Sequence, residues 1–187
     1  MTISNTLYTV AVFSENRVGL LNQISIIFTR RKLNIETLTV SPSSIKGVHK
    51  FTITTYTDKQ TIQKLVLQIE KRIDVLKAFY YTDDEIVFQE IALYKVPTIN
   101  LIDEPNLESI IRRHNARILE IAREYTVIEK TGQSDEVETL FEELKKYDIR
   151  QFVRSGRVCV TKSPIEYIDQ FLEQQKERRK RCISGAQ

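Results

Sequence analysis

The sequence predicts an α+β protein made of two tandem ferredoxin-like units, the first with the order β-α-β-β-α-β and the second smaller. Three observations lead to this prediction. Stretches in which apolar and polar residues alternate, as in strands, are followed along the chain by stretches in which apolar residues recur every three or four positions, as in helices. Only 5 Gly and 4 Pro occur in 187 residues, so the elements must be long and the connections short. After the polar sequence Asp83-Asp84-Glu85, a similar order of elements begins again.

The first unit is predicted to span residues 6–82. Its strands are expected where β-branched and aromatic residues gather, at 7–13, 35–40, 48–56 and 75–81. A helix is expected from Leu20 into the cationic run that ends at Lys32, because cations suit the negative end of a helix. A second helix is expected after Asp58, a good N-cap residue. Both helices are amphipathic, so they should cover one face of a four-stranded antiparallel sheet.

The second unit is predicted to span residues 86–165, followed by a helical basic tail over 166–187. Its strands are expected at 86–96, 117–122, 125–130, 149–153 and 158–161. Residues 97–105 hold two of the four prolines and are expected to form a loop. Helices are expected over 107–114 and from Ser134, and Pro164 is expected to open the last helix.

The positive charge of the chain is concentrated near its end. The net charge is +3, but residues 176–181 alone, Lys-Glu-Arg-Arg-Lys-Arg, contribute +4. Such a distribution argues against a nucleic-acid-binding domain, which needs Lys and Arg spread along a face. The tail itself is either an electrostatic dock for RNA, a membrane or an acidic protein surface, or a solvated helix end with pairs such as Glu173 with Lys176. We favour the solvated helix end.

Several function classes lack their sequence signals. No apolar run approaches the roughly 20 residues of a membrane helix, and no secretion signal is visible before Arg17. Neither the two cysteines, Cys159 and Cys182, nor the two histidines, His49 and His114, have metal-ligand spacing. Phosphate-binding, nucleophile-elbow and dinucleotide motifs are missing. We therefore expect a soluble protein of the reducing cytoplasm that is not an enzyme by itself, has no catalytic residues and binds no metal.

One segment, Ser14–Leu20, stands above this background. Asn16 can accept a hydrogen bond from the first-turn amides, and Gly19 lets the backbone approach a ligand closely. The N-terminus of the helix that follows is a natural place for a carboxylate. Spacing alone favours the simpler interpretation, a capped helix whose glycine packs against the sheet.

The same residues carry a family resemblance. Residues 10–24 contain E-N-x-x-G-x-L, which resembles the opening of an ACT domain. Together with the run Asn34-Ile35-Glu36-Thr37-Leu38-Thr39-Val40, they resemble the small regulatory subunit of acetolactate synthase, also called acetohydroxyacid synthase. Further matches to this family are Ile73-Asp74-Val75-Leu76, Glu90-Ile91-Ala92-Leu93 and Arg154-Ser155-Gly156. The resemblance spans residues 6–165, so the first unit is expected to be an ACT domain.

The resemblance implies a non-catalytic subunit that binds and activates the large catalytic subunit. It also implies feedback inhibition by a branched-chain amino acid, usually valine, in isoleucine, leucine and valine biosynthesis. Thiamine diphosphate, FAD and magnesium would belong to the catalytic subunit, and no cofactor to this chain. The family dimerises through its ACT domains and holds the effector at the interface. The effector-binding residues would be Asn16, Val18, Gly19 and Leu20 of one chain and Asn34 of its partner.

One departure from the family concerns the turn before Asn34. Relatives commonly have Gly-Tyr where this chain has Lys32-Leu33, and a lysine costs roughly 1–2 kcal/mol in the left-handed conformation that glycine would supply. Two alternatives remain at this point. One is a free-standing ACT-type amino-acid sensor without an enzyme partner. The other is an RNA-recognition fold, which shares the element order but would need stacking aromatics where Val48 and Ile53 stand.

Overall fold

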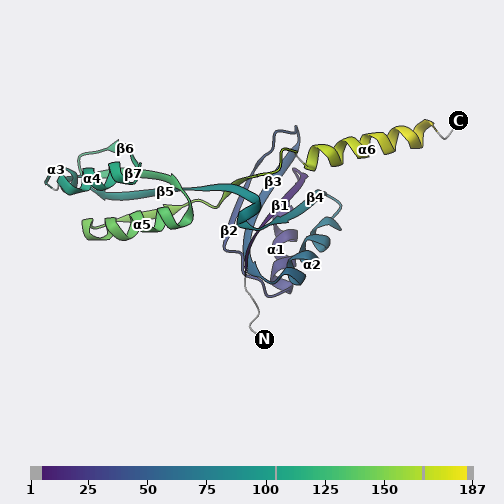
Figure 1. The fold of residues 1–187 in the computed structure, drawn as a ribbon, viewed down its shortest axis with the longest axis horizontal. Helices are drawn as coiled ribbons and strands as arrows, with labels where there is room; N and C mark the ends of the chain where they lie inside the picture. Colours follow the sequence, from purple (N-terminus) through teal and green to yellow (C-terminus); the bar gives the residue numbers. More distant parts are fainter. Residues whose placement is uncertain (1–5, 104, 166, 185–187) are drawn as a thin grey trace. The chain divides into compact units, whose positions relative to one another are not determined.

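The structure, a computed structural model, describes residues 6–103, 105–165 and 167–184. The chain forms two compact units (Figure 1). The first combines the described residues up to Val87 with those from Cys159 onward, and the second comprises Phe88–Val158. The second unit is therefore inserted into the first, and the chain passes between the units twice.

The first unit has the predicted β-α-β-β-α-β order. Its elements are β1 (Thr6–Glu15), α1 (Leu20–Arg30), β2 (Thr37–Pro42), β3 (Val48–Thr57), α2 (Lys59–Glu70) and β4 (Val75–Tyr81), followed by a short 3-10 helix, η1 (Asp83–Glu85). The sheet is antiparallel with strand order β2-β3-β1-β4, so β2 and β4 are its edges. The prediction of a mixed α+β fold with a four-stranded first sheet is confirmed.

The two faces of this sheet are covered differently. Alternate residues such as Val10 and Ile53 point toward α1 and α2 and form the main core with Ile24, Leu65 and other apolar side chains. On the opposite face, Ala11 and Phe13 pack with Ile168 of the last helix, α6 (Tyr167–Ser184). Strand residues alternate between faces, so each strand serves both layers. The last helix begins at Tyr167 rather than at Pro164, where we expected it.

Both helix signals of the first unit have a physical counterpart. The Asp58 carboxylate accepts hydrogen bonds from the N–H groups of Gln60 and Thr61, both at 2.9 Å, and so caps α2 as predicted. At the end of α1, Lys32 takes the left-handed conformation with φ 56°. There the N–H of Leu33 donates to the Phe28 carbonyl and the N–H of Lys32 to the Thr29 carbonyl, which is the Schellman arrangement.

The second unit repeats the alternation of strands and helices. The elements of this part of the chain are β5 (Ile86–Pro97), α3 (Thr98–Asp103), α4 (Pro105–Arg113), β6 (Arg117–Ile121), β7 (Tyr125–Gly132), α5 (Ser134–Leu144), the 3-10 helix η2 (Lys145–Tyr147), β8 (Gln151–Arg154) and β9 (Val158–Thr161). The first two residues of β5 and the last three of β9 belong to the first unit. The strand order is β6-β7-β5-β8, and β9 also pairs with β5. Ala92, Tyr94 and Val96 of β5 form the core with α4 and α5.

The expected loop over 97–105 is wrong, because Thr98–Asp103 is helical. Contacts distant in sequence hold this short helix. The Thr98 hydroxyl donates to the Ala122 carbonyl at 2.7 Å, and the Asn100 amide donates to the Tyr147 carbonyl at 2.7 Å. Pro105 then stands at the start of α4, where a missing N–H costs no helical hydrogen bond.

Candidate effector-binding site

The turn between β1 and α1 is anchored by backbone hydrogen bonds from both sides. The N–H of Glu15 donates to the Asp74 carbonyl at 2.9 Å, and the N–H of Asn16 donates to the Gly47 carbonyl at 3.3 Å. Arg17 forms an ion pair with Glu15, 3.2 Å between Nε and Oε2. Beyond these anchors the turn projects into solvent, and Val18 is fully exposed.

Gly19 is required by the backbone conformation. Its φ is 84°, in the left-handed region, and a Cβ built on it would meet nothing within 4 Å. The expectation that this glycine packs against the sheet is therefore wrong. The space beside Gly19 is open, so a ligand can approach the backbone there.

The first turn of α1 offers backbone donors. Gly19 is the N-cap residue and its carbonyl accepts from Gln23 at 3.1 Å. The N–H of Leu20 makes a long bond, 3.4 Å, to the Arg17 carbonyl. No described residue accepts a hydrogen bond from the N–H groups of Gly19, Leu21 or Asn22, and the first turn holds no acidic residue. These donors lie at the positive end of the helix, where a carboxylate is stabilised.

One detail of the predicted site, the Asn16 cap, needs correction. The side chain of Asn16 does not cap α1, which has no side-chain cap, and it is instead exposed. The side chain of Leu20 is 1% exposed and belongs to the core, so Leu20 can take part in the predicted site only through its backbone amide. Leu21 and Asn22 carry free amides that sequence reasoning missed, although their place in the first turn after Gly19 is a signal for them.

Asn34 lies after the Schellman turn that ends α1. Its side-chain amide donates to the Glu36 carboxylate at 2.9 Å, and its backbone carbonyl accepts from the Thr55 hydroxyl at 2.6 Å. The side chain is exposed. Lys32 takes the left-handed conformation that a glycine would supply, with φ 56°, and the chain then leads to Asn34.

A single chain does not bring Asn34 to the turn at Gly19. Ser14, just before the turn, pairs with His49, whereas Asn34 is bonded to Thr55. His49 and Thr55 are six positions apart along β3, roughly 20 Å at the rise of a strand. A site that uses both groups needs a second copy of the chain. β2, which follows Asn34, is a free edge of the sheet.

The exposed apolar residues near this edge are compatible with such a contact. Leu21 and Ile26 of α1 are 45% and 37% exposed, and Val40 of β2 is 42% exposed. An open strand edge beside exposed apolar side chains is a common site of association.

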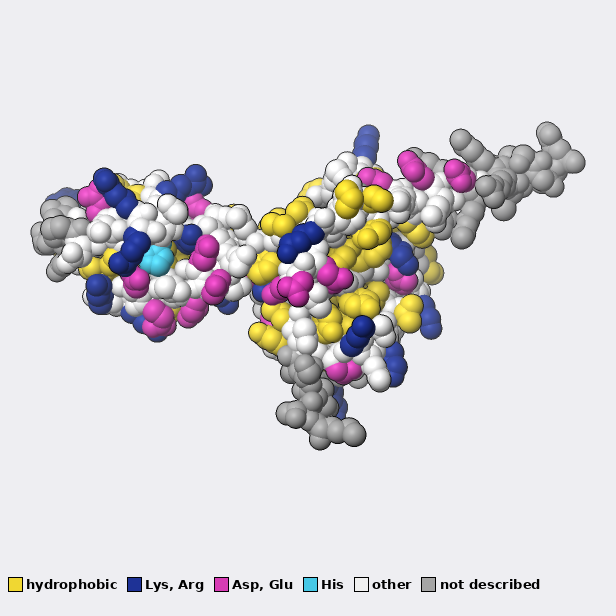
Figure 2. All heavy atoms as spheres, in the orientation of Figure 1, with side chains coloured by type: hydrophobic (Ala, Val, Ile, Leu, Met, Phe, Trp, Pro, Cys, Tyr) yellow, Lys and Arg dark blue, Asp and Glu magenta, His cyan; other side chains and the backbone are white. Residues whose placement is uncertain are grey.

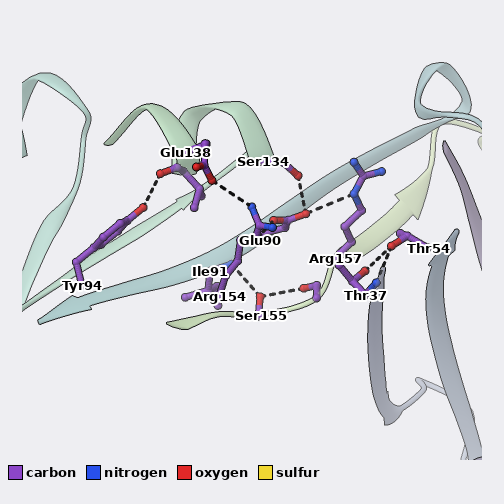
Figure 3. A network of polar contacts seen from close by, with 12 residues as sticks. Thr37, Thr54, Glu90, Ile91, Tyr94, Ser134, Glu138, Arg154, Ser155 and Arg157 are labelled. Atoms are coloured by element: carbon purple, nitrogen blue, oxygen red, sulfur yellow. Dashed lines mark hydrogen bonds and ion pairs between the residues drawn. The ribbon is translucent and has the colours of Figure 1, made fainter. Parts of the chain in front are cut away.

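The Arg154-Ser155-Gly156 motif has a structural role in the second unit (Figure 3). The N–H of Ser155 donates to the Ile91 carbonyl at 2.8 Å, and the Ser155 hydroxyl accepts from the Ile91 N–H at 2.9 Å. Gly156 accepts from the same hydroxyl at 2.9 Å. The motif thus fastens the chain after β8 to β5.

Next to this motif lies a buried carboxylate, Glu90, which is 2% exposed. It accepts from the Ser134 hydroxyl at 2.7 Å and is paired with Arg154 at 3.5 Å and Arg157 at 3.4 Å. Arg157 is also buried, and its guanidinium lies 3.8 Å from the centroid of the Phe88 ring. Two cations around one buried anion make this cluster dependent on its carboxylate.

The described residues show no group of three or more His, Cys, Asp or Glu side chains arranged to hold a metal ion. Among the described helices, none combines the length and apolar character that crossing a membrane requires.

The first unit, with its fold and its helix N-terminus beside an open strand edge, defines an ACT-type domain. Family models match both units. The model "AHAS small subunit-like ACT domain" matches residues 10–77, and the model "Small subunit of acetolactate synthase" matches residues 89–163. The chain belongs to the family of acetolactate synthase small subunits.

Individual relatives agree. The acetolactate synthase small subunit of Bacillus subtilis is 35% identical over 142 residues, which are 75% of this chain and 82% of the relative. That of Mycolicibacterium smegmatis is 29% identical over 157 residues, 84% of this chain and 92% of the relative. The crystal structure of the small subunit from Thermotoga maritima superimposes with a TM-score of 0.77 at 25% identity, covering 85% of this chain and 99% of the other.

Proposed function

We propose that this chain is the non-catalytic regulatory subunit of acetolactate synthase in the cytoplasm. It binds the large catalytic subunit, raises its activity, and makes it sensitive to feedback inhibition by a branched-chain amino acid. Thiamine diphosphate, FAD and magnesium belong to the catalytic subunit, and this chain contributes binding and regulation.

The observation that carries the effector site is the set of free N–H groups at Gly19, Leu21 and Asn22. They receive the carboxylate of the amino acid at the positive end of α1. The Asn16 amide, exposed beside them, is available to the same ligand. Asn34 of the partner subunit addresses the other polar end, because one chain holds it roughly 20 Å away.

A homodimer through the β2 edges completes this arrangement. Pairing two β2 strands around a two-fold axis joins the two sheets, and it covers the exposed side chains of Leu21, Ile26 and Val40. In such a pair, the turn of one chain can meet Asn34 of its partner. Effector binding then stabilises one state of the dimer, and inhibition follows only if the two states act differently on the enzyme.

Valine is the effector that we propose. In this proposal, apolar side chains of the sheet and of α1 form a wall that takes the isopropyl group, and a pocket of this kind discriminates by about 1–3 kcal/mol per methylene. Leucine and isoleucine should therefore inhibit as well, at higher concentrations.

Reconstitution with the catalytic subunit tests the proposal. Its activity should rise on addition of this chain, and valine, leucine and isoleucine, titrated separately, should each lower it, valine at the lowest concentration. Asn16→Ala and Gly19→Asp should weaken valine inhibition by about 10-fold or more, the value of a hydrogen bond to a charged group, and leave activation intact. Asn106→Ala, an exposed asparagine in the second unit, is the control.

The possible results separate the parts of the proposal. A chain that binds valine but neither binds nor activates the catalytic subunit is a free-standing sensor. Full valine inhibition in both variants would place the effector elsewhere.

A further inference from the structure

The second free edge of the first sheet, β4, lies beside a groove. The groove has a volume of about 620 Å³ and runs between α2 and β4. Val66 and Leu67 of α2 and Ala78 and Tyr80 of β4 line it, and Glu70, Lys77 and Glu85 are also among its lining residues. Hydrophobic side chains reach the surface in this part of the first unit (Figure 2). Leu67 is 60% exposed.

The backbone of β4 presents open hydrogen-bonding groups to this groove. The N–H of Ala78 donates to the Glu70 carboxylate at 3.2 Å, so it points away from β1 and toward α2. Groups two residues apart point the same way along an antiparallel strand, so the N–H and carbonyl of Tyr80 also face outward. No described residue is bonded to the N–H of Tyr80 or to the carbonyls of Ala78 and Tyr80.

The part of this edge that faces the groove, residues 78–81, lacks the usual protection against strand addition. Proteins guard free edges with proline, bulges or a projecting lysine. β4 contains no proline, and the extra residue where its pairing with β1 shifts register, Leu76, lies before the part of the strand that faces the groove. Its lysine, Lys77, is drawn into an ion pair with Glu70 at 2.6 Å and lies 5.9 Å from the ring centroid of Phe171. An unguarded edge beside an exposed leucine is expected to have a partner.

We propose that the groove docks an extended segment of the acetolactate synthase catalytic subunit, which adds as a fifth strand beside β4. This inference rests on the proposed function. A second copy of the chain is the less suitable occupant, because the homodimer uses β2. If β4 also paired around a two-fold axis, each sheet would join two others and the assembly would extend beyond a dimer.

The lining residues define the chemistry of the docked segment. The outward groups of Ala78 and Tyr80 bind its backbone, as in other cases of strand addition. An apolar side chain of the docked segment packs on Leu67 and Val66. The side chain two residues further along the segment packs there too, because strand side chains alternate between the two faces. Two carboxylates, Glu70 and Glu85, against one lysine, Lys77, favour a basic residue in the segment.

The test measures the affinity of the full chain for the purified catalytic subunit, and its activation. Leu67→Glu replaces an exposed side chain on a helix with a good helix former, so the fold is expected to survive. It should weaken binding by at least about 30-fold, the effect of removing a central anchor. Leu119→Glu, at a residue of the second unit that is 49% exposed, is the matched control and should bind as the wild type does.

A second pair of variants examines the backbone contact. Tyr80→Pro and Tyr80→Ala both remove the ring, but only the proline removes the outward N–H, so it should bind more weakly than the alanine variant. Valine binding by calorimetry and dimer mass by sedimentation should be unchanged in Leu67→Glu. Wild-type affinity in Leu67→Glu, or an equal loss in Leu119→Glu, would overturn the docking site while the proposed function stands. A wild-type chain that does not bind the catalytic subunit would overturn both.

Discussion

Replacing Lys32 by glycine should stabilise the first unit. Lys32 is the left-handed residue of the Schellman turn after α1, with φ 56°, and both hydrogen bonds of that turn are 3.0 Å long. A side chain in this conformation costs roughly 1–2 kcal/mol. Glycine removes that cost but loses about 0.5–1 kcal/mol through its greater freedom in the unfolded chain. The net gain in unfolding free energy is therefore about 0.5–1 kcal/mol.

Urea denaturation followed by far-ultraviolet circular dichroism measures this gain. With a denaturant slope of about 2 kcal/mol per molar, the midpoint of the first unit's transition should rise by roughly 0.3–0.5 M. Lys32→Ala keeps a Cβ in the left-handed conformation and should give no gain, and Lys32→Asn should fall between, because asparagine tolerates this region. Equal midpoints for the glycine and alanine variants would refute the assignment of strain to this turn.

Two further predictions concern the helix cap and the buried charges. Hydrogen bonds from the Thr61 hydroxyl and then the Thr61 N–H hold the pKa of Asp58 below its ordinary value. The stabilisation that the ionised Asp58 cap gives the folded chain is therefore complete above the unfolded pKa of about 3.9, and it is lost as the pH falls through the lower folded pKa. The difference in melting temperature between wild type and Asp58→Ala should therefore be constant from about pH 7 to 5 and shrink in stronger acid. Glu90→Ala leaves Arg157 buried without its carboxylate and should cost about 3–5 kcal/mol in a denaturation experiment, whereas Glu138→Ala, at an exposed partner of Arg154 3.9 Å away, should be nearly neutral.

Local patterns were sufficient for the elements that alternate or cap in their own sequence. Residues 75–81 and 158–161 form strands within the predicted bounds, and Asp58 caps α2. The helix over Thr98–Asp103 was missed because the contacts that hold it lie 24 and 47 positions away in sequence. No local periodicity carries that information, since tertiary contacts override weak propensity.

The candidate site, too, could be predicted from the sequence only in part. The position of the turn, the helix that follows it and the need for Gly19 were accessible from sequence, since a glycine after a strand and before an apolar helix favours such a turn. The direction of the Asn16 side chain was not, because the backbone of the turn is fixed by the carbonyls of Gly47 and Asp74, far along the chain. Which amides stay free depends on those same contacts.

The insertion of the second unit into the first has a consequence for biosynthesis. Ile168 and its neighbours in α6 cover the sheet face that carries Ala11 and Phe13. They leave the ribosome only after residues 88–158 have been made, which takes about 4–14 s at roughly 5–20 residues per second. During that interval the nascent first unit carries an open apolar sheet face. The pace of translation across the inserted unit therefore sets how long this face is available to chaperones or to another nascent chain.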